Sequence, residues 1–139
     1  MERTLVLIKP DGVKKKLIGK IIDRFEQAGF DIVNIKTIRL SRQLLDNWYS
    51  HHKDKPFFNQ LCQFMMETPV VVIVLQGNNI VERVRNLCGP TDSRKALKGT
   101  IRGDFGEDIQ RNIVHASDSP DRAEFEISLL FKPQEFKEV

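Results

Sequence analysis

The strongest constraint on the fold is the run Val70-Val-Val-Ile-Val-Leu75, which Pro69 introduces. All of its residues are apolar and nearly all are β-branched, a composition that predicts a buried strand. The segment from Arg3 to Ile8 is also largely apolar and ends at the turn residues Pro10-Asp11-Gly12, so it predicts another buried strand. Strands of this kind need other elements of the chain to cover them.

Apolar spacing and capping residues predict the remaining elements. In chain order they are a helix over 17–28 closed by Gly29, a strand over 30–40, two short helices over 41–66, a helix to Leu87 that Asn78-Asn79 cap and Gly89-Pro90 stop, a short strand at 113–114, and a helix to about Phe131 that begins with Ser119 and Pro120. Residues 90–111 have no clear period, and loops of that length are usually functional. This order predicts an α+β fold, a ferredoxin-like split β-α-β sandwich with a four-stranded antiparallel sheet covered by helices.

The composition fits a single globular domain, which we assign to residues 1–139, with 40% hydrophobic and 29% charged residues. No apolar run is long enough to span a bilayer, and Lys9-Pro10-Asp11 interrupts the only apolar run near the N-terminus. We therefore expect a cytoplasmic protein without a membrane partner. The formal charge of +3 slightly favours an anionic ligand, and Cys62 and Cys88 are expected to be reduced packing residues.

One histidine lies in a polar segment, Asn112-Ile-Val-His115-Ala-Ser117-Asp118-Ser119. Because imidazole titrates near neutrality, such a side chain can act as a nucleophile or a proton carrier; a structural or solvated histidine is the other interpretation. Helical spacing brings Glu126 to the edge of the apolar face of the next helix. It is either a buried carboxylate that holds one imidazole nitrogen of His115, or a surface glutamate whose carboxylate reaches solvent.

Three cationic residues are candidates for a phosphate site: Lys9 at the end of the first strand, Arg85 on a helix, and Arg102 in the long loop. Together with Thr91 and Asn112 they offer the groups that hold a polyphosphate, although each cation is equally a solvated base. The chain has no Walker sequence and no glycine-rich kinase loop. Any phosphate site must therefore be built from side chains.

An aromatic pair, Phe57-Phe58, and the nearby Leu61 offer a platform for a flat base. The alternative is that these residues belong to the helix core. We expect one of the two phenylalanines to face outward and the other inward.

Five blocks of sequence now support a resemblance to a known family. They are TLVLIKPDG (4–12), RFEQAG (24–29), KPFF (55–58), GTIRGDF (99–105) and NIVHASDS (112–119). In their order and spacing the chain resembles the nucleoside diphosphate kinases over essentially its whole length.

The resemblance implies a ping-pong reaction in which Nδ1 of His115 takes the γ-phosphate of a nucleoside triphosphate, becomes phosphohistidine and passes the group to a diphosphate. The remaining roles that it implies are Glu126 and Ser117 on the other imidazole nitrogen, Tyr49 near the histidine, Arg85, Thr91 and Arg102 on the phosphates, Lys9 and Asn112 at the ribose hydroxyls and terminal phosphate, and Phe57 and Leu61 on the base. Stacking reads few edges of a base, so broad tolerance of bases and sugars is expected. Mg2+ is expected as part of the substrate, bound through its phosphates.

Two departures from the family pattern concern a loop and the residue after the histidine. The loop from Asp92 to Gly99 lacks the prolines that many members carry, so we expect it to be less rigid, and Ala116 replaces a common glycine. Family analogy implies a homo-oligomer, and because few residues follow Phe136, the choice between tetramer and hexamer stays open.

Two other functions compete with the kinase. A nucleic-acid-binding module is disfavoured because the apolar strands carry no aromatic pair for stacking and the charge excess is small. A phosphohistidine relay protein without nucleotide specificity would need His115 but not Phe57, Arg85 or Thr91.

Overall fold

A computed structural model describes residues 1–136, and residues 137–139, on which the expectation about the C-terminal end depends, lie outside the described residues. The elements are β1 (Glu2–Ile8), α1 (Pro10–Lys14), α2 (Ile18–Gln27), β2 (Asp31–Ile38), α3 (Arg42–Trp48), α4 (Phe58–Met65), β3 (Val70–Gly77), α5 (Ile80–Cys88), η1 (Ser93–Lys95), α6 (Ile101–Phe105), β4 (Val114–Ala116), α7 (Pro120–Leu130) and η2 (Pro133–Phe136). The strands form one four-stranded sheet in the order β2-β3-β1-β4, with every neighbouring pair antiparallel. The predicted α+β sandwich is therefore confirmed.

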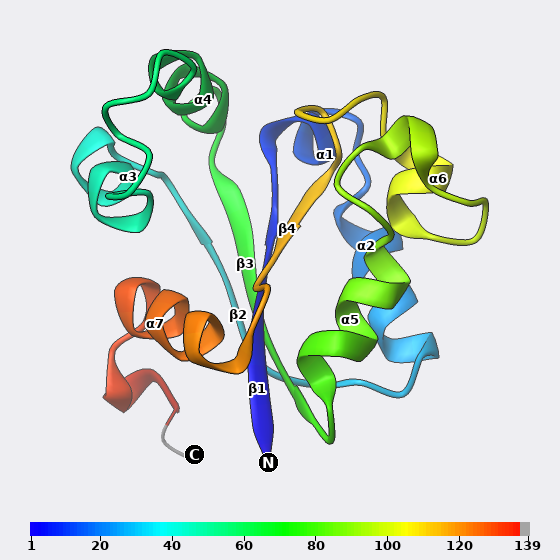
Figure 1. Cartoon of the computed structure of the whole chain (residues 1–139). Helices are drawn as coiled ribbons and strands as arrows, with labels where there is room; N and C mark the ends of the chain where they lie inside the picture. The colour runs from blue at the N-terminus through cyan, green and yellow to red at the C-terminus, as the bar shows by residue number, and fades with distance from the viewer. Residues whose placement is uncertain (137–139) are drawn as a thin grey trace.

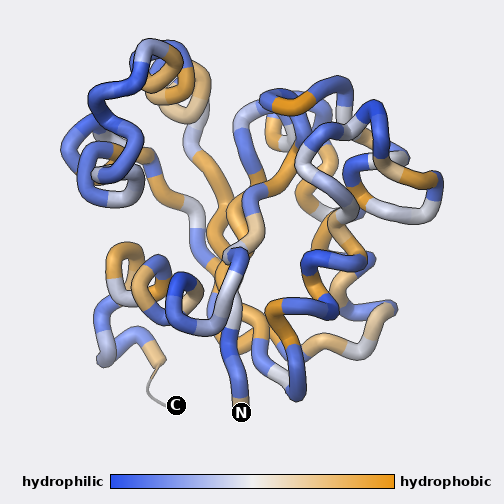
Figure 2. Tube along the Cα trace, in the orientation of Figure 1, coloured by the Kyte–Doolittle hydropathy of each residue, from blue (hydrophilic) through white to orange (hydrophobic). Residues whose placement is uncertain are grey.

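Helices cover both faces of the sheet, as Figure 1 shows with α2, α5 and α6 on one side and α3, α4 and α7 on the other. Alternate residues of the central strands β1 and β3 enter two separate cores. Val6 and Ile73 pack with Phe25 of α2, whereas Leu7 and Val72 belong to the core that contains helices α3, α4 and α7. The apolar centre of both strands is visible in Figure 2. Burial on both faces explains the uninterrupted apolar run from which the fold was predicted.

Two local predictions are wrong. Pro10-Asp11-Gly12, predicted as a turn, lies within the short helix α1, since a proline suits the first position of a helix. Asn79 does not cap α5 with its side chain but takes a left-handed conformation with φ of 51°. The cap comes instead from Glu2 of β1, whose Oε1 accepts a hydrogen bond from the Val81 N–H at 3.0 Å. A residue far away in the sequence thus satisfies this helix end.

The unperiodic segment between α5 and β4 contains η1 and α6. Thr100 caps α6, because its Oγ1 accepts the Gly103 N–H at 3.0 Å. The predicted loop is held to α2 by Asp104, which accepts hydrogen bonds from the Gly99 N–H at 3.0 Å and from Arg24 Nη2 at 2.6 Å. These contacts restrain the loop although it lacks the prolines that many family members carry.

Cys62 and Cys88 are free and buried, which confirms that they are packing residues. None of the helices in residues 1–136 combines the length and apolar character that a membrane crossing requires.

Candidate active site

The sheet places His115 in the wall of a cleft. In β4 it pairs with Leu7 of β1, and its ring packs edge-on against Trp48 of α3 with 5.4 Å between centroids. The side chain is 24% exposed, so it is held in the wall of the cleft while still accessible. α7 begins directly after this strand, and its predicted cap is confirmed because Ser119 Oγ accepts the Arg122 N–H at 3.1 Å.

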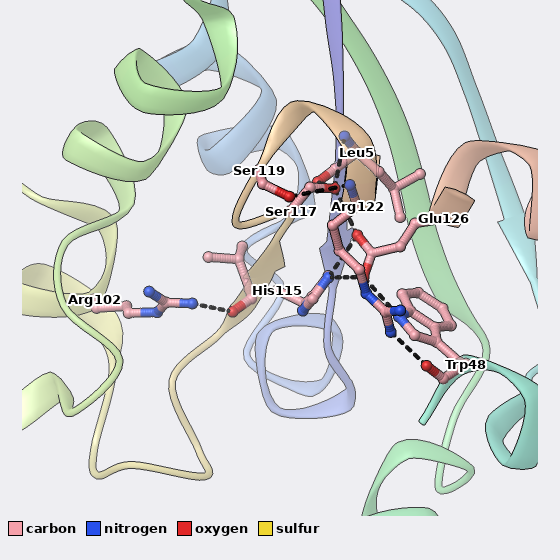
Figure 3. A network of polar contacts seen from close by, with 9 residues as sticks. Leu5, Trp48, Arg102, His115, Ser117, Ser119, Arg122 and Glu126 are labelled. Carbon is pink, nitrogen blue, oxygen red and sulfur yellow. Dashed lines mark hydrogen bonds and ion pairs between the residues drawn. The ribbon is translucent and has the colours of Figure 1, made fainter. Parts of the chain in front are cut away.

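Glu126 of α7 is a buried carboxylate with four polar neighbours, so the surface alternative is wrong. The residue is 1% exposed. Its carboxylate accepts hydrogen bonds from Ser117 Oγ at 2.5 Å and Trp48 Nε1 at 2.7 Å, and both oxygens lie 3.0 Å from His115 Nε2 (Figure 3). Arg122 Nε also lies 3.5 Å from Oε2 and forms an ion pair with the carboxylate. Burial by itself raises the pKa of Glu126, but the contacts with His115, Ser117 and Trp48 outweigh it and leave the pKa below its usual value. The carboxylate is therefore ionised at neutral pH.

This contact fixes which imidazole nitrogen is available. Nε2 faces the ionised carboxylate, which favours the tautomer with the proton on Nε2. Nδ1 then keeps its lone pair. Ser117 and Glu126 lie behind the ring and do not line the cleft, so they act on His115 rather than on a ligand.

The cleft has a volume of about 280 Å³. It brings together most of the predicted binding residues from separate elements, and its lining is Lys9, Tyr49, Leu61, Met65, Arg85, Thr91, Arg102, Ile109, Asn112, Val114, His115, Ala116 and Asp118. Among the predicted binding residues, Phe57 is absent from this lining. The other predicted binding residues all line the cleft.

Lys9 and Asn112 form a buried pair at the floor of the cleft. Lys9 Nζ donates to Asn112 Oδ1 and to the Gln110 carbonyl, both at 2.8 Å. The Asn112 amide donates to the carbonyls of Thr91 at 2.9 Å and Ile109 at 3.1 Å, so it uses both of its hydrogens. One ammonium hydrogen and one amide lone pair remain for a ligand. Burial lowers the pKa of Lys9 to about 8.

Arg102 has a structural task that the sequence did not predict. Its guanidinium donates to the carbonyls of Asn112 at 3.3 Å, Gly89 at 2.7 Å and Val114 at 2.7 Å, and Figure 3 shows the last of these contacts. These bonds join the ends of α5 and β4. Three of the five guanidinium hydrogens are used, which leaves two for phosphate oxygens. Arg85 and Thr91, in contrast, are exposed on the cleft wall.

Tyr49 also lines the cleft, and its ring stacks on Trp48 with 5.7 Å between ring centroids. Burial and the nearby Glu126 raise the pKa of its phenol above the usual value. The hydroxyl is therefore a hydrogen-bond donor at every physiological pH.

The expected division between the two phenylalanines is confirmed. Phe57 is 48% exposed and Phe58 is 1% exposed. The prediction missed Ile109, an apolar residue in the polar loop that is 59% exposed and lines the cleft with Leu61 and Met65. In the sequence, Ile109 is the one apolar residue of the polar stretch from Gly106 to Arg111, and that isolated apolar side chain is the signal that would have identified it.

Within residues 1–136, no group of three or more histidine, cysteine, aspartate or glutamate side chains is arranged to hold a metal ion. The cleft instead carries the cations Lys9, Arg85 and Arg102, with Asp118 as a carboxylate on its wall. This donor set fits a metal that arrives on the phosphates of a substrate.

The comparisons with known proteins agree with this geometry. The family model described as nucleoside diphosphate kinase matches residues 2–136. The chain belongs to the nucleoside diphosphate kinase family. It is 50% identical to the nucleoside diphosphate kinase of Pelotomaculum thermopropionicum, over 99% of this chain and 93% of the relative, and 52% identical to that of Pyrococcus horikoshii, over 99% and 89%.

Solved structures show the same relationship. The nucleoside diphosphate kinase of Aquifex aeolicus superimposes with a TM-score of 0.93 at 44% identity, covering 98% of this chain and 99% of the other. A halophilic nucleoside diphosphate kinase from Halobacterium salinarum, solved in complex with CDP, gives a TM-score of 0.94 at 42% identity, over 99% and 92% of the two chains. The chain is thus a nucleotide-handling phosphotransferase, and neither the nucleic-acid-binding module nor the relay protein describes it.

Proposed function

We propose that this chain transfers the γ-phosphate of a nucleoside triphosphate to a nucleoside diphosphate through a phosphohistidine at His115. The observation that carries the proposal is the contact of Nε2 with the Glu126 carboxylate at 3.0 Å, which leaves Nδ1 as the nucleophile. The Nδ1 lone pair forms a bond to the γ-phosphorus while the bond to the β–γ bridging oxygen breaks and the diphosphate leaves. The reverse step, with a second diphosphate as acceptor, regenerates the imidazole.

The carboxylate stabilises the positive charge that the ring gains during attack. Its contacts with Ser117 and Trp48 keep it in place, so the imidazole needs little reorientation in the transition state. Lys9, Arg85 and Arg102 offset the charge that develops on the transferred phosphoryl group and the leaving diphosphate. Thr91 and Asn112 would complete the phosphate and ribose contacts, and Tyr49 would donate its hydroxyl near the histidine.

Mg2+ would enter as part of the substrate, held by its phosphates, and would neutralise part of their charge. Leu61, Ile109 and the exposed Phe57 offer apolar contacts to a base without reading its edges. Broad tolerance of bases and sugars follows from that mode of contact. The CDP complex of the halobacterial enzyme supports nucleoside diphosphates as ligands.

We further propose that residues 1–139 act as one domain in the cytoplasm and assemble as a homo-oligomer, either a tetramer or a hexamer. Family analogy supports the assembly. Size-exclusion chromatography with light scattering decides between the two states, and a monomer at micromolar concentration would contradict both.

The test of the phosphohistidine is the intact mass of the protein after exposure to ATP and Mg2+. The chain has three histidines, so His51→Ala and His52→Ala are matched controls for His115→Ala. We expect an adduct that is labile to acid and stable to base in the wild type and in both controls, and none in His115→Ala. An adduct that survives His115→Ala would overturn the proposal.

A further inference from the structure

The backbone two residues before His115 is strained. Ile113 has φ of 76°, in the left-handed region that β-branched residues avoid. The Val114 N–H donates to the Asn112 carbonyl at 2.8 Å and closes a γ-turn around this residue. A γ-turn with positive φ is rare, and it persists only where the surroundings hold it.

The segment after β1 provides that hold. The Lys9 N–H donates to the Ile113 carbonyl at 2.8 Å, and the Ile113 N–H donates to Asp11 Oδ2 at 2.9 Å. Gly12 packs so closely that an added Cβ would lie 3.1 Å from Ile113 Cγ2 and 3.2 Å from its carbonyl oxygen. Both polar groups of the strained residue are therefore paired with the start of helix α1, through Lys9 and Asp11.

Asp11 is an unusual choice for this position. The residue is 6% exposed, and Oδ1 is buried without a hydrogen-bond partner among the described residues. A buried carboxylate that is only half satisfied is costly, and a neutral side chain could accept the same N–H. The other oxygen of Asp11 accepts the Ile113 N–H, so the side-chain hydrogen bond of this buried carboxylate is made to the strained residue.

We infer that Asp11 is a positioning residue for phosphoryl transfer: it holds Ile113 in the strained turn that sets the place of His115. This inference rests on the function proposed above. The role acts through the backbone, so paired variants of Asp11 and Ile113 can test it.

Asp11→Asn is the conservative variant. The amide oxygen still accepts the Ile113 N–H, so the turn remains. Phosphorylation of His115 should therefore be slowed much less in Asp11→Asn than in Asp11→Ala.

Asp11→Ala tests the anchor, with Ile113→Gly and Ile113→Ala as backgrounds. Glycine adopts positive φ without strain, whereas alanine loses nearly the same side chain and keeps the strain. In the alanine background, loss of Asp11 should slow single-turnover phosphorylation of His115 by roughly 10- to 100-fold. In the glycine background, the same loss should cost several-fold less. Circular dichroism would confirm that each variant is folded.

The outcomes are distinct. Equal slowing in both backgrounds would overturn the anchor role, and so would slowing in Asp11→Asn as large as that in Asp11→Ala. A crystal structure of Asp11→Ala that keeps Ile113 at positive φ would also overturn the anchor, without reference to activity. If the wild type itself gains no phosphate on His115, the proposed function fails instead.

Discussion

At the scale of single residues, donors from three parts of the chain converge on the Glu126 carboxylate. Trp48 comes from α3, His115 and Ser117 from the last strand and the turn after it, and Arg122 from α7, the helix that carries Glu126 itself. A neutral amide has one acceptor oxygen instead of two and adds donors where donors already point. The network is therefore sensitive to the charge of this one side chain.

Replacement of Glu126 by glutamine should lower the phosphorylation rate of His115 by about 100-fold, because the ring loses its negative partner and its preferred tautomer. Stability should fall by about 1–3 kcal/mol, since buried donors lose their acceptor. Stopped-flow single-turnover kinetics and thermal melts measure the two effects. Glu124→Gln, on the same helix with a side chain that is 55% exposed, is the control and should change neither. Wild-type kinetics in Glu126→Gln would refute the assigned role.

Lys9 predicts the pH dependence of the free enzyme. Because burial lowers its pKa to about 8, the ammonium is present below that pH and is lost as the pH rises through it. Tyr49, whose pKa is raised above its usual value, does not titrate in this window. We expect kcat/KM to fall above pH 8, mainly through a rise in KM. This fall in kcat/KM should be absent from the residual activity of Lys9→Gln. If kcat/KM of Lys9→Gln still falls above pH 8, another group causes it.

At the scale of elements, helix α7 aligns Glu126 with His115, and its first turn is fixed by Ser119 and Pro120. Ser119→Ala removes the cap and should cost about 1 kcal/mol of folding free energy. For a domain of this size that corresponds to a Tm lower by roughly 3–5 °C, with catalysis nearly retained in the folded protein.

Ser41→Ala is the matched control on α3, where Ser41 Oγ accepts the Leu44 N–H at 3.1 Å. It should lower the Tm by a similar amount. Ser119→Asp should restore the cap, so a Tm no higher than that of Ser119→Ala would show that the cap is not the cause.

At the scale of the whole molecule, the ion pair between Arg24 and Asp104 joins α2 to the loop that supplies Thr91 and Arg102. The two side chains are 28% and 24% exposed, and Arg24 Nη1 also donates to the Gly99 carbonyl at 3.2 Å. Such a partly exposed pair contributes at most about 1 kcal/mol to overall stability. Its main effect should be local, on the mobility of the loop.

Arg24→Ala should therefore leave the Tm within a few degrees of the wild type while trypsin cleaves faster after Arg94, Lys95 and Lys98. The KM for nucleotide should rise several-fold, because the loop supplies cleft residues. Timed digestion followed by mass spectrometry locates the cuts. Lys20→Ala, at an exposed position of α2, should behave like the wild type; unchanged digestion of Arg24→Ala would show that the pair does not restrain the loop.

Local patterns in the sequence were sufficient for the sheet and its longer helices, but not for the five-residue helices α1 and α6. The apolar run from Val70 to Leu75 predicts a strand because burial on both faces removes polar residues, and Ser119 with Pro120 predicts a helix start because caps act on neighbouring backbone groups. The same locality explains the error at Asn79. Asn79 looks like a cap, but Glu2 from another element takes that task, and the sequence around Asn79 carries no sign of it.

By itself, the sequence determined the strands and the longer helices, the family and the identity of the candidate nucleophile, since these depend on short-range spacing and on motifs. Only the tertiary structure decided that Glu126 is buried, that Arg102 clamps three carbonyls, that Ile109 faces the cleft and that Asp11 holds the strained Ile113. Each of these depends on a contact between residues from different parts of the fold. Whether a polar group is buried, paired or available to a ligand is a property of its neighbours in space, and the fold alone supplies those neighbours.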